Sequence, residues 1–415
     1  MSDPARLDPN CLWNHSFLLW WLGNAQSSLG STLAGLALSF LVLHQTGSAG
    51  AMGVTLALGM LPALLAPFAG TLADRLPLRL PLLVGDILRG AIQVGVGVAA
   101  LHGEVPLAVL NALTFVNGLL TQLTQPAAMS VLPRLVPSTE ITRASALMQS
   151  TAQLAQLLGL VGGGVLVSHL GSAPSLIADG LSFWVMAALL PFIVLPGRAA
   201  SQEAGFWADF KGGLAYARSS LLTLMLPVIA FFINASLAPM EVLLPKRMVE
   251  LGAGAQGYGL FFGLSAVGML LVSLLASVLN RRLPLRPGSV AGLSGIGLAV
   301  LGLAVTRTAP QMYGVAVGFG LAVGLTNTCI GALFATVIAP EFRGRVSSLM
   351  GAVGIIGQPL VLLLLAPVAD RFSMASLFAL AGLVTLAGAG LWAYALRRTP
   401  ATRTPDGDPG LIAAP

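Results

Sequence analysis

Three acidic residues, Asp86, Asp179 and Glu241, stand inside long apolar runs of the chain, where an ionised side chain is strongly disfavoured. A carboxylate in such a place can take up a proton and release it again when its surroundings change. Arg89 follows Asp86 by three residues, so that on a helix the two side chains share a face and can pair. We interpret this pair as structural and rank Asp86 and Arg89 behind Glu241 as candidates for proton exchange.

Glu241 has the most informative neighbours of the three acids. It follows Pro239 and precedes Pro245, Lys246 and Arg247. Burial favours the protonated carboxyl, whereas nearby cations favour the ionised carboxylate. Two interpretations stay open. Either Glu241 exchanges a proton or a cationic solute, or it forms an ion pair with Lys246 or Arg247 at the end of its helix.

Other catalytic patterns find little support in the sequence. Residues 292–295, Gly-Leu-Ser-Gly, are similar to the Gly-x-Ser-Gly motif of intramembrane serine proteases, but no histidine follows His169 to serve as the base. No phosphate-binding Gly-x-x-x-x-Gly-Lys-Ser/Thr motif occurs. Cys11 and Cys329 are isolated, and no histidine has metal-ligand spacing. We therefore expect no enzyme activity, no ATP-driven pumping, no cofactor and no bound metal.

The composition is that of a membrane protein. Hydrophobic residues make up 56% of the chain and charged residues only 9%, whereas a soluble domain has about 25% charged residues. The net charge of +6 does not indicate a nucleic-acid partner, because the 21 Lys and Arg residues are scattered between apolar runs.

A helix needs about 20 apolar residues to cross the hydrocarbon of a bilayer. On this criterion the chain has twelve candidate spans, and the predicted fold is an all-α membrane protein. The spans are residues 17–43, 49–72, 80–101, 105–130, 144–169, 173–195, 221–243, 256–279, 289–306, 310–338, 346–368 and 373–396.

Two repeated segments indicate that the chain consists of two related halves. The sequence Arg-Leu-Pro-Leu-Arg at 75–79 recurs at 282–286, and the segment 143–148 is similar to 345–350. Because the two offsets nearly agree, we predict two pseudo-symmetric six-helix bundles. The predicted parts are an N-terminal segment (1–16), a first bundle (17–196), a linker with an interfacial helix (197–220), a second bundle (221–397) and a disordered tail (398–415).

Positive charge predicts the orientation of the chain in the membrane. With both termini in the cytoplasm, most Lys and Arg residues fall in inner segments, as the positive-inside rule requires. The outer side then holds only Lys246, Arg247, Arg307 and Arg371. We expect a multi-pass protein of the cell (inner) membrane with both termini cytoplasmic.

The segment 70–75, Gly-Thr-Leu-Ala-Asp-Arg, resembles the signature loop of the major facilitator superfamily, although Pro77 and Leu78 replace part of its usual continuation. Segments 86–89, 132–137 and 340–346 resemble the drug- and siderophore-exporting branch of that superfamily, which includes macrolide-efflux and enterobactin-exporter proteins. Residues 159–164 resemble the Gly-Pro-x-x-Gly-Gly motif of exporters, with Leu160 in place of proline.

The resemblance implies roles for particular residues. It implies an inner gate built from the signature loop and the start of the eleventh span, comprising Gly70, Asp74, Arg75, Arg79, Arg343 and Arg345. It implies that spans one, four, seven and ten line a substrate cavity with the amides of Asn24, Gln26, Asn117, Gln122, Gln125, Asn234 and Asn327. It implies close helix packing at Gly159, Gly163 and Gly164. The helices that carry Asp86 and Asp179 are peripheral in this superfamily, and Asp179 is expected near the outer surface.

The function implied is secondary active export of a small amphipathic or apolar solute, such as a drug, a macrolide or a siderophore, by alternating access. A proton gradient is a candidate energy source, and the expected partners are the solute and the lipid bilayer around a monomer. The alternative is a membrane receptor or scaffold with the same fold that transports nothing.

Overall fold

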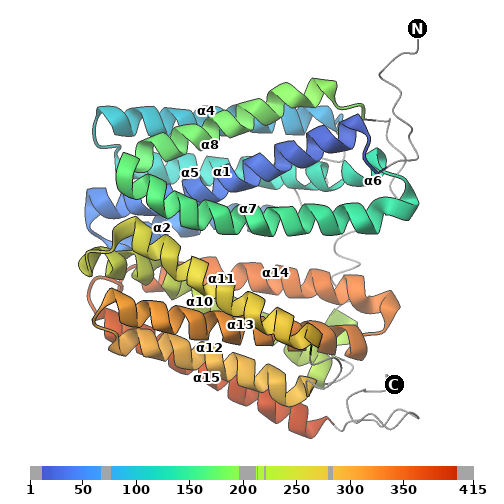
Figure 1. Ribbon diagram of the computed structural model, residues 1–415, viewed down its shortest axis with the longest axis vertical. Coiled ribbons are helices and arrows are strands. Elements are labelled where there is room, and N and C mark those ends of the chain that lie inside the picture. Colours follow the sequence, from blue (N-terminus) through green and yellow to red (C-terminus); the bar gives the residue numbers. More distant parts are fainter. Residues whose placement is uncertain are drawn as a thin grey trace. The chain divides into compact units, whose positions relative to one another are not determined.

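The computed structural model describes residues 12–66, 76–195, 212, 214–218, 221–278 and 284–399, and this part of the chain is helical without a strand. Figure 1 shows long helices lying side by side within each part of the chain. The elements are α1 (His15–Thr46), α2 (Ala49–Met60), η1 (Leu61–Leu65), α4 (Arg79–His102), α5 (Leu107–Met129), α6 (Leu132–Leu135), η2 (Ser138–Glu140), α7 (Ile141–Leu170), α8 (Ser172–Leu189), η3 (Leu190–Phe192), α10 (Leu221–Glu250), α11 (Gly254–Val278), α12 (Leu285–Val305), α13 (Ala309–Val337), α14 (Pro340–Leu365) and α15 (Met374–Arg398).

Helix α1 shows how local sequence sets helix ends. The side chain of Asn14 accepts a hydrogen bond of 2.9 Å from the backbone N–H of Phe17, which satisfies a donor that the first turn leaves free. The Nδ2 of Asn14 also donates to the carbonyl of Leu135 at 2.6 Å. At the other end Gly47 adopts the left-handed conformation, with φ of 63°, and its N–H bonds to the carbonyl of Leu43.

Eleven of the described helices are long and apolar enough to cross a membrane. Only part of the predicted second span is described, and it forms a shorter apolar helix, Ala49–Leu65. Residues 67–72 of that span lie outside the described residues. The prediction of an all-α membrane fold is confirmed, with two notable differences in helix length. Helix α10 continues to Glu250, so that Lys246 and Arg247 lie on the helix, and α14 begins at Pro340 instead of 346.

The chain folds as two compact units. Unit 1 comprises Met1–Gly47, Val54–Gln202 and Gly254–Gly259, and unit 2 comprises Ser48–Gly53, Glu203–Ala253 and Leu260–Pro415. In unit 1, α1 packs on α7 and α8, and α4 packs on α8. In unit 2, α12 packs on α13 and α15, and α10 packs on α14 and α15.

Each unit has a core around a buried tryptophan. Trp20 in unit 1 is 2% exposed and Trp392 in unit 2 is fully buried. The indole N–H of Trp392 donates to Ser289 Oγ at 2.8 Å. Trp20 differs, because its Nε1 is buried and has no hydrogen-bond partner within the described chain.

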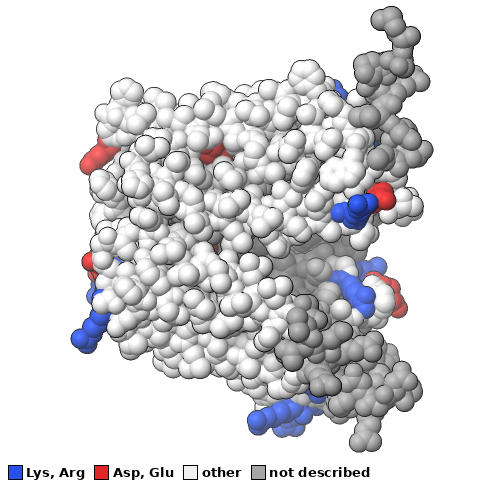
Figure 2. Space-filling model, viewed as in Figure 1, with Lys and Arg blue, Asp and Glu red and all other residues white. Residues whose placement is uncertain are grey.

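The outer surface of the helices is apolar. Large side chains such as Leu154, Leu170 and Leu274 are about 60% exposed, as expected for residues that face lipid. Figure 2 shows Lys, Arg, Asp and Glu gathered at helix ends, with the faces between them almost free of charge. The predicted interfacial helix in 197–220 and the tail 398–415 lie largely outside the described residues.

Candidate functional site

Unit 1 contains a cleft of about 420 Å³, which is within the range of about 300–1,000 Å³ typical of small-molecule sites. Its lining combines aromatic rings, a thioether, amides and hydroxyls. The residues are Trp20, Trp21, Asn24, Ala25, Ser28, Gln125, Ala128, Met129, Leu132, Ser145, Met148, Gln149, Thr151 and Ala152.

Helical periodicity explains why these residues meet. Helix α1 contributes residues 20, 21, 24, 25 and 28, which recur every three or four positions and therefore lie on one face. Helix α7 contributes 145, 148, 149 and 152 with the same spacing, and α5 contributes its last turns. Leu132 of α6 completes the lining, so the cleft lies between α1, α5, α6 and α7 of one unit.

The two adjacent tryptophans are in different hydrogen-bonding states. Trp21 Nε1 donates to Thr151 Oγ1 at 3.0 Å, which ties α1 to α7. Trp20 Nε1 is the buried donor without a partner in the described chain. Asn24 Nδ2 donates to the carbonyl of Trp20 at 2.8 Å. The cleft therefore offers ring faces and amides, and the buried, unsatisfied donor belongs to one of its lining residues. None of the described residues that line the cleft is ionisable.

The structure separates the amides that the sequence groups together. Asn24 and Gln125 line the cleft. Gln26 points elsewhere on α1, since its Nε2 donates to the carbonyl of Ser182 on α8 at 2.7 Å. Asn117 accepts a hydrogen bond of 3.3 Å from Arg89 Nε.

The remaining predicted amides do not line this cleft. Gln122 lies on α5 and is partly exposed, and Asn327 on α13 is exposed. In unit 2, Asn234 Nδ2 donates to the carbonyl of Ala230 in its own helix at 2.8 Å. The cleft residues Trp21, Ser145, Gln149 and Thr151 are absent from the sequence-based prediction, although the three- and four-residue spacing of the polar positions on α7 was a usable signal.

The charged residues of α4 and α8 form a cluster in which Asp179 is buried and Asp86 and Arg89 are partly exposed. Asp179 lies in the middle of α8 and not at its start as expected, and its side chain is buried, at 1% exposure. Gln93 Nε2 donates to Asp179 Oδ2 at 2.9 Å. Arg89 interacts electrostatically with both Asp86 and Asp179, and its Cζ lies 4.0 Å above the centre of the Phe183 ring.

Glu241 has a different partner from either of those considered. It is partly buried on α10 and shares a side-chain hydrogen bond with Gln358 of α14. Lys246 pairs with Asp370 at 2.6 Å, and Arg247 pairs with Glu250 at 3.2 Å. The structure therefore pairs both cations with acids other than Glu241.

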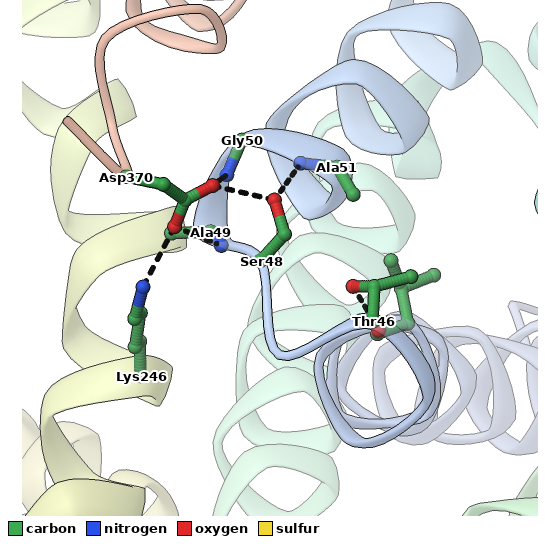
Figure 3. A network of polar contacts seen from close by, with 8 residues as sticks. Thr46, Ser48, Ala49, Gly50, Ala51, Lys246 and Asp370 are labelled. Atoms are coloured by element: carbon green, nitrogen blue, oxygen red, sulfur yellow. Dashed lines mark hydrogen bonds and ion pairs between the residues drawn. The ribbon is translucent and has the colours of Figure 1, made fainter.

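Asp370, between α14 and α15, holds the start of α2 (Figure 3). Its carboxylate accepts hydrogen bonds from Ser48 Oγ at 2.5 Å and from the backbone N–H groups of Ala49 and Gly50 at 3.0 Å each. Lys246 donates to the same carboxylate. Partial burial raises the pKa of Asp370, but the hydrogen bonds from Lys246, Ser48, Gly50 and Ala49 together outweigh it and hold the pKa at about 2. Asp370 is therefore ionised at neutral pH, and it lies where helix-end amides favour an anion.

Half of the predicted inner-gate residues, Gly70, Asp74 and Arg75, lie outside the described residues. Arg79 Nη2 donates to the carbonyl of Ile193 at 2.8 Å. Arg343 Nε donates to the carbonyl of Ile338 at 3.1 Å, and the Cζ of Arg345 lies 5.8 Å from the centre of the Phe342 ring.

The glycines of α7 lie at close helix contacts. A Cβ at Gly159 would lie 2.9 Å from Thr32 Cβ and 3.0 Å from the carbonyl of Leu29. A Cβ at Gly164 would contact the carbonyl of Ala255 and the Cα of Gly259, whereas Gly163 has more room against α1.

Comparison with known proteins defines the class. Residues 9–317 match the family model described as transmembrane secretion effector, a family of the major facilitator superfamily. The chain is 27% identical over 380 residues to macrolide efflux protein A of Streptococcus pyogenes, covering 89% of this chain and 93% of that protein. It is 28% identical over 372 residues to the multidrug efflux pump Tap of Mycobacterium tuberculosis, covering 85% of this chain and 86% of that protein.

Solved structures agree on the fold. A bacterial homologue of the human lysosomal transporter Spinster, in an inward-facing and occupied conformation, has a TM-score of 0.72 at 14% identity and covers 96% of this chain and 98% of its own. An auto-inhibited POT family peptide transporter also has a TM-score of 0.72 at 14% identity, covering 92% of this chain and 97% of its own.

The fold and these matches define a multi-pass membrane transporter, not an enzyme. The chain belongs to the transmembrane secretion effector family of the major facilitator superfamily.

Proposed function

We propose that this protein is a secondary active exporter of small amphipathic solutes, of the macrolide and multidrug class, that works by alternating access and is driven by a proton gradient. The observation that carries the proposal is the cleft in unit 1, together with relatives named as efflux proteins. Its mixture of rings, thioether and amides suits a solute with an apolar face and several oxygen acceptors.

None of the described residues that line the cleft is ionisable, and this favours a particular class of solute. Recognition there depends on area and hydrogen bonds, so a neutral or weakly charged solute is favoured over a highly charged one. Trp20 Nε1 is a buried donor of a lining residue, and a solute whose binding uncovers it would satisfy it with a carbonyl or hydroxyl oxygen.

The proposal also includes the arrangement in the cell. The charge distribution supports both termini in the cytoplasm, because this orientation leaves only Lys246, Arg247, Arg307 and Arg371 on the outer side. The inner gate would comprise Gly70, Asp74, Arg75, Arg79, Arg343 and Arg345, and the working unit would be a monomer. A reporter fused after Arg286 should then be active only as a cytoplasmic reporter.

The test is drug accumulation in a bacterium that lacks its own efflux pumps. Cells producing the protein should accumulate less of at least one macrolide or cationic dye than cells with an empty vector. Dissipation of the proton gradient should abolish the difference. Equal accumulation in both kinds of cell would leave a receptor or scaffold as the better interpretation. A difference that survives dissipation of the gradient would contradict proton coupling.

A pair of variants ties that flux to the cleft. Ala152→Trp places a large ring in the cleft lining, whereas Leu154→Trp adds the same ring two residues later at a position that is 60% exposed. We expect Ala152→Trp to abolish efflux and Leu154→Trp to retain it, at equal protein levels. Equal efflux by both variants would remove the cleft from the transport path.

A further inference from the structure

Asp179 is the most deeply buried acid of the described chain, at 1% exposure. Its two oxygens have different surroundings. Oδ2 accepts a hydrogen bond of 2.9 Å from the Gln93 amide on α4. Oδ1 faces two hydroxyls at longer range, Ser31 Oγ of α1 at 3.4 Å and Ser182 Oγ of α8 at 3.5 Å.

Glycines allow the backbone of neighbouring helices to close around this carboxylate. A Cβ at Gly30 of α1 would lie 2.8 Å from both Asp179 Oδ1 and Ser182 Oγ. A Cβ at Gly180 would lie 2.7 Å from the carbonyl of Gly90 and 2.8 Å from the N of Val94 on α4. Asp179 is therefore enclosed by protein on its α1 and α4 sides.

One cation serves two acids in this part of unit 1. Arg89 interacts electrostatically with Asp86 and Asp179, and it also bonds to Asn117 of α5. Helix α5 carries no charged residue between Leu107 and Met129. The titratable residues of α1 and α7 lie near the helix ends and are His15, His44, Arg143 and His169.

With both acids ionised, the cluster would carry one uncompensated negative charge among apolar helices. Such a charge is strongly disfavoured there, and one bound proton makes the cluster neutral. We propose that the cluster of Asp86, Arg89 and Asp179 is a proton-binding site and that the proton is held on Asp179 Oδ1.

The choice of Oδ1 follows from the chemistry of its neighbours. A serine hydroxyl donates to a carboxylate and accepts from a carboxylic acid, so Ser31 and Ser182 serve both protonation states. The Gln93 amide nitrogen only donates, so Oδ2 stays the acceptor. The step is a proton transfer alone: Oδ1 gains a proton from water and later returns it to water, and no other bond changes.

The proton-binding site and the solute cleft share helices, and their coupling rests on the proposed function. Helix α1 contacts Asp179 through Gly30 and Ser31 and lines the cleft with its face from Trp20 to Ser28. Arg89 bonds to α5, which also lines the cleft. Loss of the proton changes the charge that Arg89 faces and reverses the hydrogen bond between Ser31 and Oδ1, and these changes act on the two cleft helices.

The test is infrared difference spectroscopy of the purified full-length protein in lipid nanodiscs during a pH titration. Wild type should show the C=O band of a buried carboxylic acid, which disappears as the pH rises. Asp179→Asn should remove the band, and the exposed-loop control Glu104→Gln should retain it. A band unchanged in a folded Asp179→Asn variant would overturn the proposal.

Two further variants keep the test decisive if Asp179→Asn fails to fold. Asp86→Asn removes the second negative charge, so the midpoint of the band should fall by about one pH unit or more. Ser31→Ala removes a hydroxyl partner of Oδ1 and should shift the band frequency. A band that responds to neither change belongs to another acid, and the proposal fails.

This readout needs no solute, so it separates the proton site from the exporter proposal. Efflux in cells combined with an unaltered band in Asp179→Asn would contradict the site and leave the exporter standing. The expected band without any efflux would support the site and contradict the exporter.

Discussion

At the scale of single residues, the cleft-lining Trp20 has a buried indole N–H with no partner in the described chain. Trp20→Phe retains a ring and removes only the N–H. If a solute oxygen accepts from this donor, the variant should bind macrolides about fivefold more weakly, which corresponds to about 1 kcal/mol for one hydrogen bond. Equilibrium binding to the purified protein measures this.

The matched control is Trp392→Phe in unit 2, where the lost N–H leaves the Ser289 hydroxyl buried without that donor. This control should lower thermal stability and leave solute affinity unchanged. A Trp20→Phe variant that is more stable than wild type and binds equally well would mean that no solute reaches this donor.

The lowered pKa of Asp370 leads to a second prediction at the scale of residues. Its pKa of about 2 lies below the ordinary value of 3.8, so the stabilisation is complete above about pH 4 and is lost as the pH falls toward 2. Asp370→Asn weakens the cap on α2 by about 1 kcal/mol and should lower the unfolding temperature by about 2 °C. This difference should stay constant from pH 8 to pH 5 in thermal unfolding of the detergent-solubilised protein.

Glu250→Gln is the control for the Asp370 variant. It removes one acid and the ion pair with Arg247, a pair with both partners partly exposed, and should change the unfolding temperature much less. A difference between wild type and Asp370→Asn that grows or shrinks between pH 8 and pH 5 would show that Asp370 titrates in that range.

At the scale of helices, α7 offers neighbouring glycines in unlike surroundings. A Cβ at Gly159 would press on Thr32 and the backbone of Leu29, whereas a Cβ at Gly162 meets nothing within 4 Å. Gly159→Ala should therefore destabilise the protein by about 1–3 kcal/mol through overpacking, and Gly162→Ala should not. Thermal unfolding of the two variants decides the matter, and equal loss in both would indicate a general cost of alanine in this helix.

The positions of the helices could be predicted from the sequence, but the faces with which they contact other helices could not. Length and hydropathy predict spans because every membrane helix must be apolar over about 20 residues. The same rule makes such helices apolar all round, so periodicity does not reveal which side faces protein and which faces lipid. This is why the burial of Asp179 escaped prediction. The cleft face of α7 is an exception, because the spacing of its polar positions could have been recognised. Asp370 was not predicted as a cap because its partners at the start of α2 are more than 300 residues away in the chain.

At the scale of the whole molecule, the buried acids fall into different settings in the two units. Asp179 in unit 1 shares the charge of Arg89, whereas Glu241 in unit 2 has a neutral partner, Gln358, while Lys246 pairs with Asp370. The sequence places Arg89, Asp179 and Glu241 in predicted spans, but the partner of Glu241 depends on α14, which is more than a hundred residues away in the chain. We propose Asp179 for energy coupling and Glu241 for solute recognition.

The difference in setting leads to a prediction about solute charge. A carboxylate in an apolar helix without a paired cation attracts a positively charged solute. We expect Glu241→Gln to lower the flux of a cationic dye such as ethidium by about tenfold in proteoliposomes and to change the flux of a neutral solute little. Asp179→Asn should abolish uphill flux of both solutes and leave downhill flux intact, because only the use of the proton gradient is lost. Equal loss of both fluxes in Glu241→Gln would instead assign Glu241 to proton exchange, and unchanged fluxes would leave it with only its hydrogen bond to Gln358.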